Sequence, residues 1–125
     1  MLPATARPIA FILTRDRAAL LPFYRDVLGL AVTGADDYGT VLDARGLELR
    51  LTTVADHVAG PHPVLSWSVP DLRATVAALV ARGVTFLIYE GFGQDADGIW
   101  TSPDGKVMVA WFADPEGNVL GLSEG

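Results

Sequence analysis

The sequence contains no cysteine, which excludes disulfide bonds, thiolate metal ligands and a thiol nucleophile. Basic side chains are also scarce, since Lys106 is the one lysine and the formal net charge is -6. Binding to nucleic acid depends on clustered lysine and arginine side chains that neutralise phosphates. We therefore expect no nucleic-acid partner.

Long hydrophobic runs are absent as well. No stretch approaches the length of a membrane span, and the opening segment MLPATARPIA lacks the apolar core of a signal peptide. We therefore expect a cytoplasmic protein with no membrane partner. Half of the 125 residues are hydrophobic, which is typical of one ordered globular domain.

One pattern occurs twice, in residues 7–30 and 62–84: a short apolar strand, an aspartate, apolar residues at helical spacing, and a glycine. Asp16 and Asp71 are placed to cap the helix N-termini. Pro22 lies inside the first helical pattern, so we expect a bend or a late helix start there. Two glycines are placed to end the helices: Gly29 and Gly83.

Strand signals follow each helix. In the first half they lie at residues 31–34, 38–44 and 47–53, and in the second at 84–90, 98–101, 106–112 and 118–123. Turn signals separate them at Arg45-Gly46, 102–105 (SPDG) and 114–117 (DPEG). Both halves are therefore interpreted as one plan of strand, helix, then three strands, and the second half has one strand signal more. This predicts an α+β fold of two pseudo-symmetric βαβββ modules, about 7–54 and 63–125, joined by a linker at about 55–62.

The segments FYRDVLGL (23–30) and WFADPEGNVLGL (111–122), together with the repeat, resemble the vicinal oxygen chelate superfamily. That family contains glyoxalase I, extradiol dioxygenases, fosfomycin resistance enzymes and bleomycin resistance proteins. The resemblance covers nearly the whole chain. It implies curled mixed sheets that form a cleft, with a metal held in most catalytic members by His or Glu from the first and last strands of each module.

The resemblance places the family's four metal-ligand positions at Ile9, Arg50, Val64 and Gly121. Isoleucine and valine side chains have no donor atom, glycine has no side chain, and a guanidinium repels a metal ion. We therefore expect no metal and no cofactor. Bleomycin resistance proteins also lack the metal and bind their drug without chemistry, so the resemblance implies a metal-independent small-molecule binding protein, such as one that sequesters a natural product or antibiotic.

Strand alternation assigns side chains to the cleft. Glu48 and Arg50 alternate with leucines that face the helix, and Ser66 and Ser68 alternate with Trp67, which we expect in the core. Trp111 is expected to face the cleft beside Arg50, offering stacking and a positive charge. Two alternatives stay open: Trp111 fills space between the sheets, or Arg50 pairs with Glu48 or Asp43 on the surface.

A glycine-rich aromatic loop spans residues 89–100. Its aromatic side chains could close over a ligand, or the loop could be a simple connector. Asp95 and Asp97 are interpreted as solvated acids, and His57 and His62 as exposed linker residues. The candidate ligand-binding residues are Glu48, Arg50, Ser66, Ser68, Tyr89, Phe92, Trp100 and Trp111.

Two other functions stay open. One is a metal-dependent or metal-free glyoxalase-, dioxygenase- or isomerase-like enzyme that uses residues such as Glu48, Glu90 or His62. The other is an association module whose cleft is filled by its own side chains. We also expect a homodimer, because small curled sheets expose apolar faces and strand edges that a second copy can cover.

Overall fold

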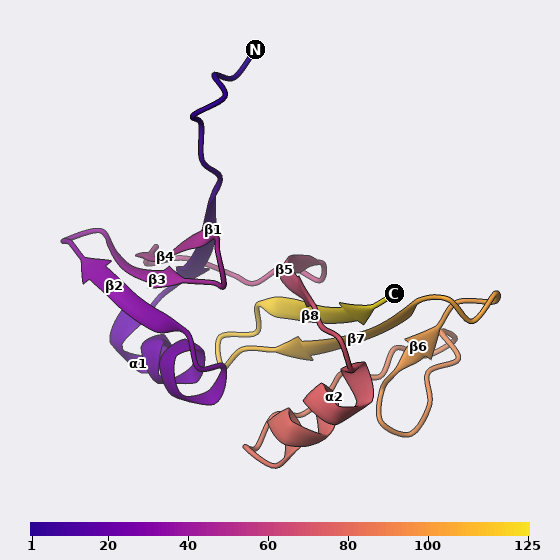
Figure 1. Ribbon diagram of the computed structural model, residues 1–125. Helices are drawn as coiled ribbons and strands as arrows, with labels where there is room; N and C mark the ends of the chain where they lie inside the picture. The colour runs from indigo at the N-terminus through magenta and orange to yellow at the C-terminus, as the bar shows by residue number, and fades with distance from the viewer. The chain divides into compact units, whose positions relative to one another are not determined.

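The computed structural model describes residues 1–125 and divides into two compact units, Met1–Val58 and Ala59–Gly125 (Figure 1). Each unit contains one four-stranded mixed sheet and one helical segment after its first strand. The predicted α+β fold with two similar modules is confirmed. Neither sheet closes on itself, so each has two edge strands.

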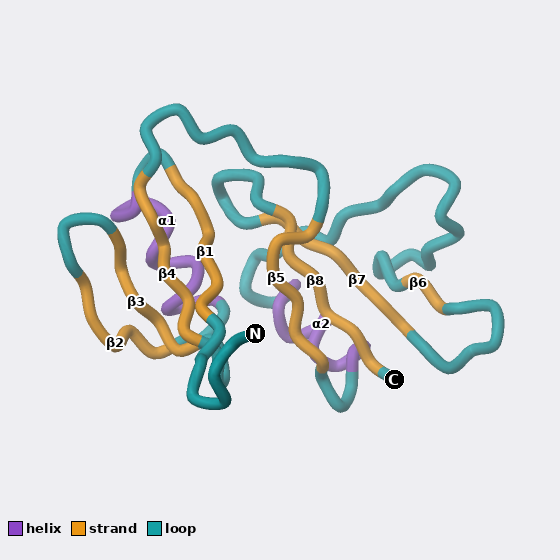
Figure 2. Tube along the Cα trace, turned by 90° about the horizontal axis from the view of Figure 1, so that it is seen from above, coloured by secondary structure: helices purple, strands orange, loops and turns teal.

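The first unit contains four strands and a helical segment. In chain order these are β1 (Ile9–Thr14), α1 (Arg17–Pro22), η1 (Phe23–Val27), β2 (Ala31–Ala35), β3 (Gly39–Asp43) and β4 (Glu48–Thr53). The strand order across the sheet is β1-β4-β3-β2 (Figure 2). Strand β1 runs parallel to β4, and the other neighbours are antiparallel.

The second unit repeats this plan, but its edge strand β6 has only two residues. Its elements are β5 (Pro63–Ser68), α2 (Leu72–Val80), β6 (Trp100–Thr101), β7 (Met108–Ala113) and β8 (Val119–Glu124). The order is β5-β8-β7-β6, with β5 parallel to β8. Neither helix has the length or apolar character that crossing a bilayer requires.

The predicted helix caps are confirmed. Asp16 accepts a hydrogen bond from the Ala19 N–H at 3.1 Å, and Asp71 accepts one from the Ala74 N–H at 3.0 Å. Each bond satisfies a first-turn N–H that has no partner within the helix. The α2 terminus has a second cap from outside the helix, because Glu124 of β8 accepts from the Leu72 N–H at 2.8 Å.

The first helix changes geometry at Pro22. It begins at Arg17, so the expectation of a late start is wrong. Proline has no N–H to donate to the carbonyl four residues earlier, and the chain continues beyond Pro22 as the wider π-helix η1. The Leu28 N–H accordingly donates to the Phe23 carbonyl, five residues back. This widening coincides with complete burial of the Tyr24 side chain.

The predicted strand at residues 84–90 is wrong. Phe86 makes a single bridge to Phe112 of β7, and the Leu87 N–H donates to the Trp111 carbonyl at 2.8 Å. Two residues later the Tyr89 N–H donates to the side chain of Gln94 instead of a strand. The segment therefore leaves the sheet after Leu87.

Alternation along the strands sorts the side chains between two faces, as predicted. In β4, Leu49 and Leu51 are fully buried while Glu48 is exposed. In β7, Ala110 and Phe112 are fully buried, and α2 packs on this strand. Trp67, expected in the core, is half-buried.

The double cap of α2 generates a stability prediction. Replacement of Asp71 by alanine removes the bond to the Ala74 N–H and should lower the free energy of unfolding by about 1 kcal/mol. Asp71→Asn keeps a capping oxygen and is the matched control. Urea unfolding followed by circular dichroism measures both; equal midpoints for the two variants would contradict the capping role.

Candidate functional site

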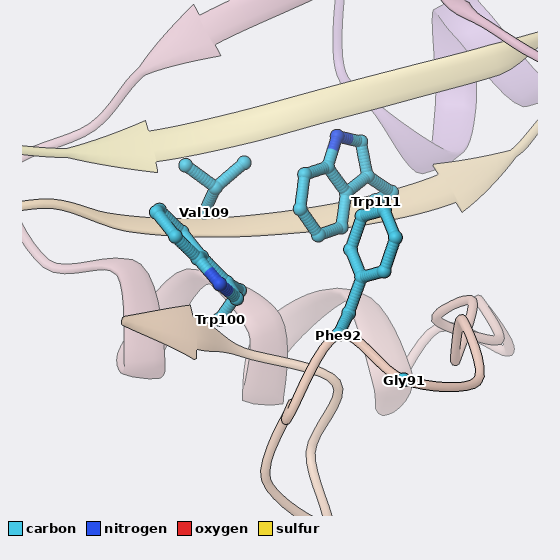
Figure 3. A pocket seen from close by; sticks show the side chains of 5 residues that line it. All are labelled: Gly91, Phe92, Trp100, Val109 and Trp111. Atoms are coloured by element: carbon cyan, nitrogen blue, oxygen red, sulfur yellow. The ribbon is translucent and has the colours of Figure 1, made fainter. Parts of the chain in front are cut away.

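Four of the predicted site residues come together in the second unit. Tyr89 lies against Phe92, with ring centroids 5.3 Å apart. Trp111 meets both edge to face, at 5.6 Å from Tyr89 and 6.0 Å from Phe92. Trp100 completes the set beside Val109. Apart from Tyr89, these side chains line an open cavity of about 420 Å³. We call this cavity the aromatic pocket; its lining residues are Gly91, Phe92, Trp100, Val109 and Trp111 (Figure 3).

The strand register places the two tryptophans on one face. Trp100 of β6 pairs with Val109 of β7, so both side chains point to the same side of the sheet. Trp111 lies two residues further along β7 and shares that face. Ala110 and Phe112, between and beyond them, are buried on the opposite face. The pocket therefore lies on the sheet face that points away from α2.

The side chain of Gln94 makes three bonds within the loop that carries Phe92. Its Oε1 accepts from the Tyr89 N–H at 2.7 Å, and its Nε2 donates to the carbonyls of Leu87 at 2.9 Å and Gly98 at 2.7 Å. These three bonds link both ends of the segment 87–98. The sequence interpretation missed Gln94, because nothing in a lone glutamine indicates which backbone groups it will reach.

Two exposed acids of the loop form ion pairs with the second helix. Arg73 of α2 donates to Asp97 at 2.9 Å and to Asp95 at 3.1 Å. Asp95 also accepts from the N–H groups of Asp97 and Ile99. Desolvation opposes ionisation of Asp95, yet the bonds from Ile99, Arg73 and Asp97 together hold its pKa below the usual range. Both aspartates are exposed, as the sequence interpretation expected, and their ion pairs with Arg73 add a surface link between the loop and α2.

The predicted serines lie on the same sheet face as the aromatic pocket. Ser66 of β5 pairs with Gly121 of β8, and Gly121 pairs with Trp111 of β7. Ser66 and Ser68 are both exposed, and neither hydroxyl bonds another residue. The register thus brings four predicted site residues onto one face of one sheet: Ser66, Ser68, Trp100 and Trp111. Tyr89 and Phe92 contact Trp111 from the neighbouring loop.

The remaining two predicted residues, Glu48 and Arg50, lie on β4 of the first unit. Arg50 donates to Asp36 at 2.6 Å, a partner that the sequence interpretation missed when it weighed Glu48 and Asp43. Asp36 also accepts from the backbone N–H groups of Tyr38 and Gly39. Glu48 is exposed. That Arg50 and Trp111 act on one ligand stays a prediction.

The Asp36 carboxylate is strongly favoured in its charged form. The Arg50 guanidinium, followed by the Tyr38 and Gly39 N–H bonds, lowers the pKa of Asp36 to about 2. Arg17 donates to the Asp36 carbonyl as well, at 3.0 Å. Two arginines therefore hold the β2–β3 turn, and Arg50 is engaged in an ion pair within its own unit.

The residues at the family's metal positions do not fit a metal. Ile9, Val64 and Gly121 supply no side-chain donor, and Arg50 is a cation bound to Asp36. Within either unit, no group of three or more histidine, aspartate or glutamate side chains is placed to hold an ion.

Comparison with known proteins supports the fold. Residues 6–122 match the family model described as Glyoxalase/Bleomycin resistance protein/Dioxygenase superfamily. None of the curated proteins matches significantly. A solved superfamily member from Sphaerobacter thermophilus is similar at 21% identity and a TM-score of 0.72, covering 97% of this chain and 98% of that chain.

Two further solved structures are similar over almost their whole length. Lactoylglutathione lyase from Agrobacterium tumefaciens is 18% identical, with a TM-score of 0.71 and coverage of 99% of this chain and 96% of that chain. A glyoxalase/bleomycin resistance protein/dioxygenase from Alicyclobacillus acidocaldarius is also 18% identical, with a TM-score of 0.71 and coverage of 99% and 94%. At these identities the likeness establishes the fold alone.

The Asp36–Arg50 pair makes the stability of the first unit depend on acid pH. The pKa of Asp36 is about 2 in the folded chain, against a usual value of 3.8, so its contribution is complete above about pH 4. That contribution is lost as the pH falls toward 2. In Arg50→Gln, carboxyl NMR titration should show the Asp36 pKa shifted up toward 3.8; an unchanged value would contradict the role of Arg50.

The Gln94 bonds generate a second prediction. Gln94→Glu keeps an acceptor for the Tyr89 N–H but has no N–H for the Leu87 and Gly98 carbonyls. We expect the free energy of unfolding to fall by about 2 kcal/mol, with faster proteolysis between residues 87 and 98. Glu90→Gln, the reverse exchange at a neighbouring exposed side chain, is the control and should leave both quantities unchanged. Equal behaviour of the two variants would show that Gln94 does not hold the loop.

Proposed function

Because the chain belongs to the Glyoxalase/Bleomycin resistance protein/Dioxygenase superfamily, we propose that it binds a small organic molecule in the aromatic pocket without the help of a metal. The observation that carries this proposal is the lining of the pocket, which consists of two tryptophans, a phenylalanine, a valine and a glycine. Small-molecule sites are typically concave and mostly apolar, with a few polar groups that set orientation. A cavity of about 420 Å³ is of the size that such ligands occupy.

The lining favours a planar aromatic ligand. Phe92 and Trp111 meet edge to face, so their ring faces point in different directions and a flat ring can stack on one while it touches the edge of the other. None of the five lining residues carries a formal charge. A charged ligand would therefore find no opposite charge in the pocket to offset its desolvation, so the lining favours a neutral ligand.

Two polar groups are available to orient the ligand. The indole N–H groups of Trp100 and Trp111 donate to no residue of the chain. An indole N–H is a donor only, so these groups suit an acceptor on the ligand, such as a carbonyl or ether oxygen. The combination fits many planar natural products, and sequestration of such a compound is the most concrete form of the proposal.

The loop tether supports binding rather than turnover. Gln94 and Arg73 hold the segment that contains Phe92, so one wall of the pocket is fixed before a ligand arrives. The metal positions of the family supply no donor set, and no acid or base lines the pocket. A ligand held only by stacking and N–H bonds would be recovered chemically unchanged.

Self-association is part of the proposal. Strands β1 and β5 are edge strands, and each carries a large exposed hydrophobic side chain, Phe11 at 56% and Val64 at 51%. Exposed apolar edges of this kind favour pairing with a second chain. Sedimentation equilibrium should give the mass of a dimer; a monomer at every concentration tested would reject this part.

The binding function is tested with tryptophan emission. In the Trp67→Phe background the two remaining tryptophans, Trp100 and Trp111, both line the pocket, so a planar aromatic compound that binds there should quench the emission. Adding Trp111→Leu should weaken binding about tenfold, the loss expected from one aromatic contact. Chelators should have no effect.

Trp67→Phe is itself the matched control, because Trp67 pairs with the buried Leu122 on the helix-side face. By calorimetry its affinity should equal that of the unmodified chain. Affinity that disappears with chelator, or that survives Trp111→Leu unchanged, would overturn the proposal. So would recovery of the compound in altered form.

A further inference from the structure

We propose that the binding site of the second unit extends beyond the aromatic pocket, across β8 to β5, and selects a two-part ligand. One part is a planar aromatic group, and the other is a neutral group rich in hydroxyls or amides about 10 Å away. This inference rests on the proposed binding function and adds the class of ligand. Three features of the sheet carry it: its register, its uncharged polar side chains, and Gly121.

The register aligns polar and aromatic residues in two rows across the sheet. In the first row, Ser66 of β5 lies opposite Gly121 of β8, which lies opposite Trp111 of β7. Since neighbouring strands are about 4.8 Å apart, the row spans about 10 Å from β7 to β5. The second row runs in the same order through Ser68, Ser123, Val109 and Trp100.

The β5 end of the rows offers hydrogen bonds without charge. The hydroxyls of Ser66, Ser68 and Ser123 bond no other residue of the chain. Each hydroxyl can both donate and accept. No acidic or basic side chain belongs to either row. The matching ligand group is therefore neutral and bears several donors and acceptors, as a sugar or a short amide chain does.

Gly121 connects the two ends. It is not among the glycines with positive φ, so its backbone conformation does not require glycine. A Cβ at this position would lie 2.5 Å from Ser66 Oγ. A larger side chain would stand between Ser66 and Trp111 and divide the row. Gly121 is itself buried, and the Ser66 hydroxyl occupies the space where a side chain at this position would stand. The glycine therefore lets the polar end of the row reach over β8, toward Trp111.

Two probes separate the parts of the site. 2-Naphthol presents the aromatic group alone, and 2-naphthyl β-D-glucoside adds a neutral polyol. Calorimetry with the full chain should show the glucoside binding about tenfold more tightly than the naphthol, as expected for two added hydrogen bonds. In Ser66→Ala/Ser68→Ala this advantage should disappear while the affinity for naphthol stays unchanged.

Two further variants complete the design. Gly121→Ala should reduce glucoside binding about tenfold with naphthol binding retained; because the clash is with a rotatable hydroxyl, the combination with Ser66→Ala relieves it if folding is affected. Thr85→Ala removes an exposed hydroxyl outside the rows and is the control.

The outcomes distinguish the two proposals. Naphthol binding without a preference for the glucoside, or equal losses for both probes in the serine variant, overturns the extended site but leaves the aromatic pocket in place. If neither probe binds, both the aromatic pocket as a binding site and its extension are overturned. A loss in Thr85→Ala equal to that in the serine variant also rejects the extension.

Discussion

Burial of alternate residues in β7 is the constraint on which the second unit's binding face depends. Ala110 and Phe112 are fully buried, and the Phe112 ring also meets Phe86 with centroids 5.4 Å apart. A slip of one residue would exchange the two faces of the strand. Phe112 would then lie on the open face, and Trp111 would enter the core. The hydrophobic core thus determines which residues are available to a ligand.

The residues at the family's metal positions differ between the two units. Ile9 and Gly121 stand in regular register on their strands, and Val64 lies where the pairing of β5 with β8 shifts by one residue. The sheets of the family are therefore present, but these three positions supply no metal donor. On the last strand of the first unit, the family's metal position is occupied by Arg50, which forms an ion pair with Asp36. On the last strand of the second unit the same position is Gly121, which lies between the Ser66 hydroxyl and the Trp111 indole. The two modules have diverged in charge, although they share one fold.

Much of the fold was predictable from the sequence because it depends on local patterns. Alternation predicted which side chains of β4 and β7 are buried, and Asp16 and Asp71 predicted the helix N-caps. Alternation and the glycine-rich loop also indicated six candidate residues that lie near one another in the second unit, and their role in binding stays a prediction.

Two of the failures come from side-chain hydrogen bonds made across a loop or a turn. Gln94 takes the Tyr89 N–H that a strand at 84–90 would need, and Asp36 reaches Arg50 from a turn fourteen positions earlier. Neither partner has a sequence signature. The π-helix after Pro22 was missed because a proline indicates a disturbed helix without indicating its form.

The loop held by Gln94 and Arg73 has a consequence for the thermodynamics of recognition. Ordering a mobile segment on association commonly reduces affinity through lost conformational entropy. Here the three bonds of Gln94 and the two of Arg73 restrict the segment within the folded chain. The entropic cost of ordering it therefore falls on folding, and complex formation keeps more of the enthalpy gained from stacking. Because the segment does not change conformation to accommodate a ligand of the wrong shape, this preorganised wall discriminates between ligands by shape.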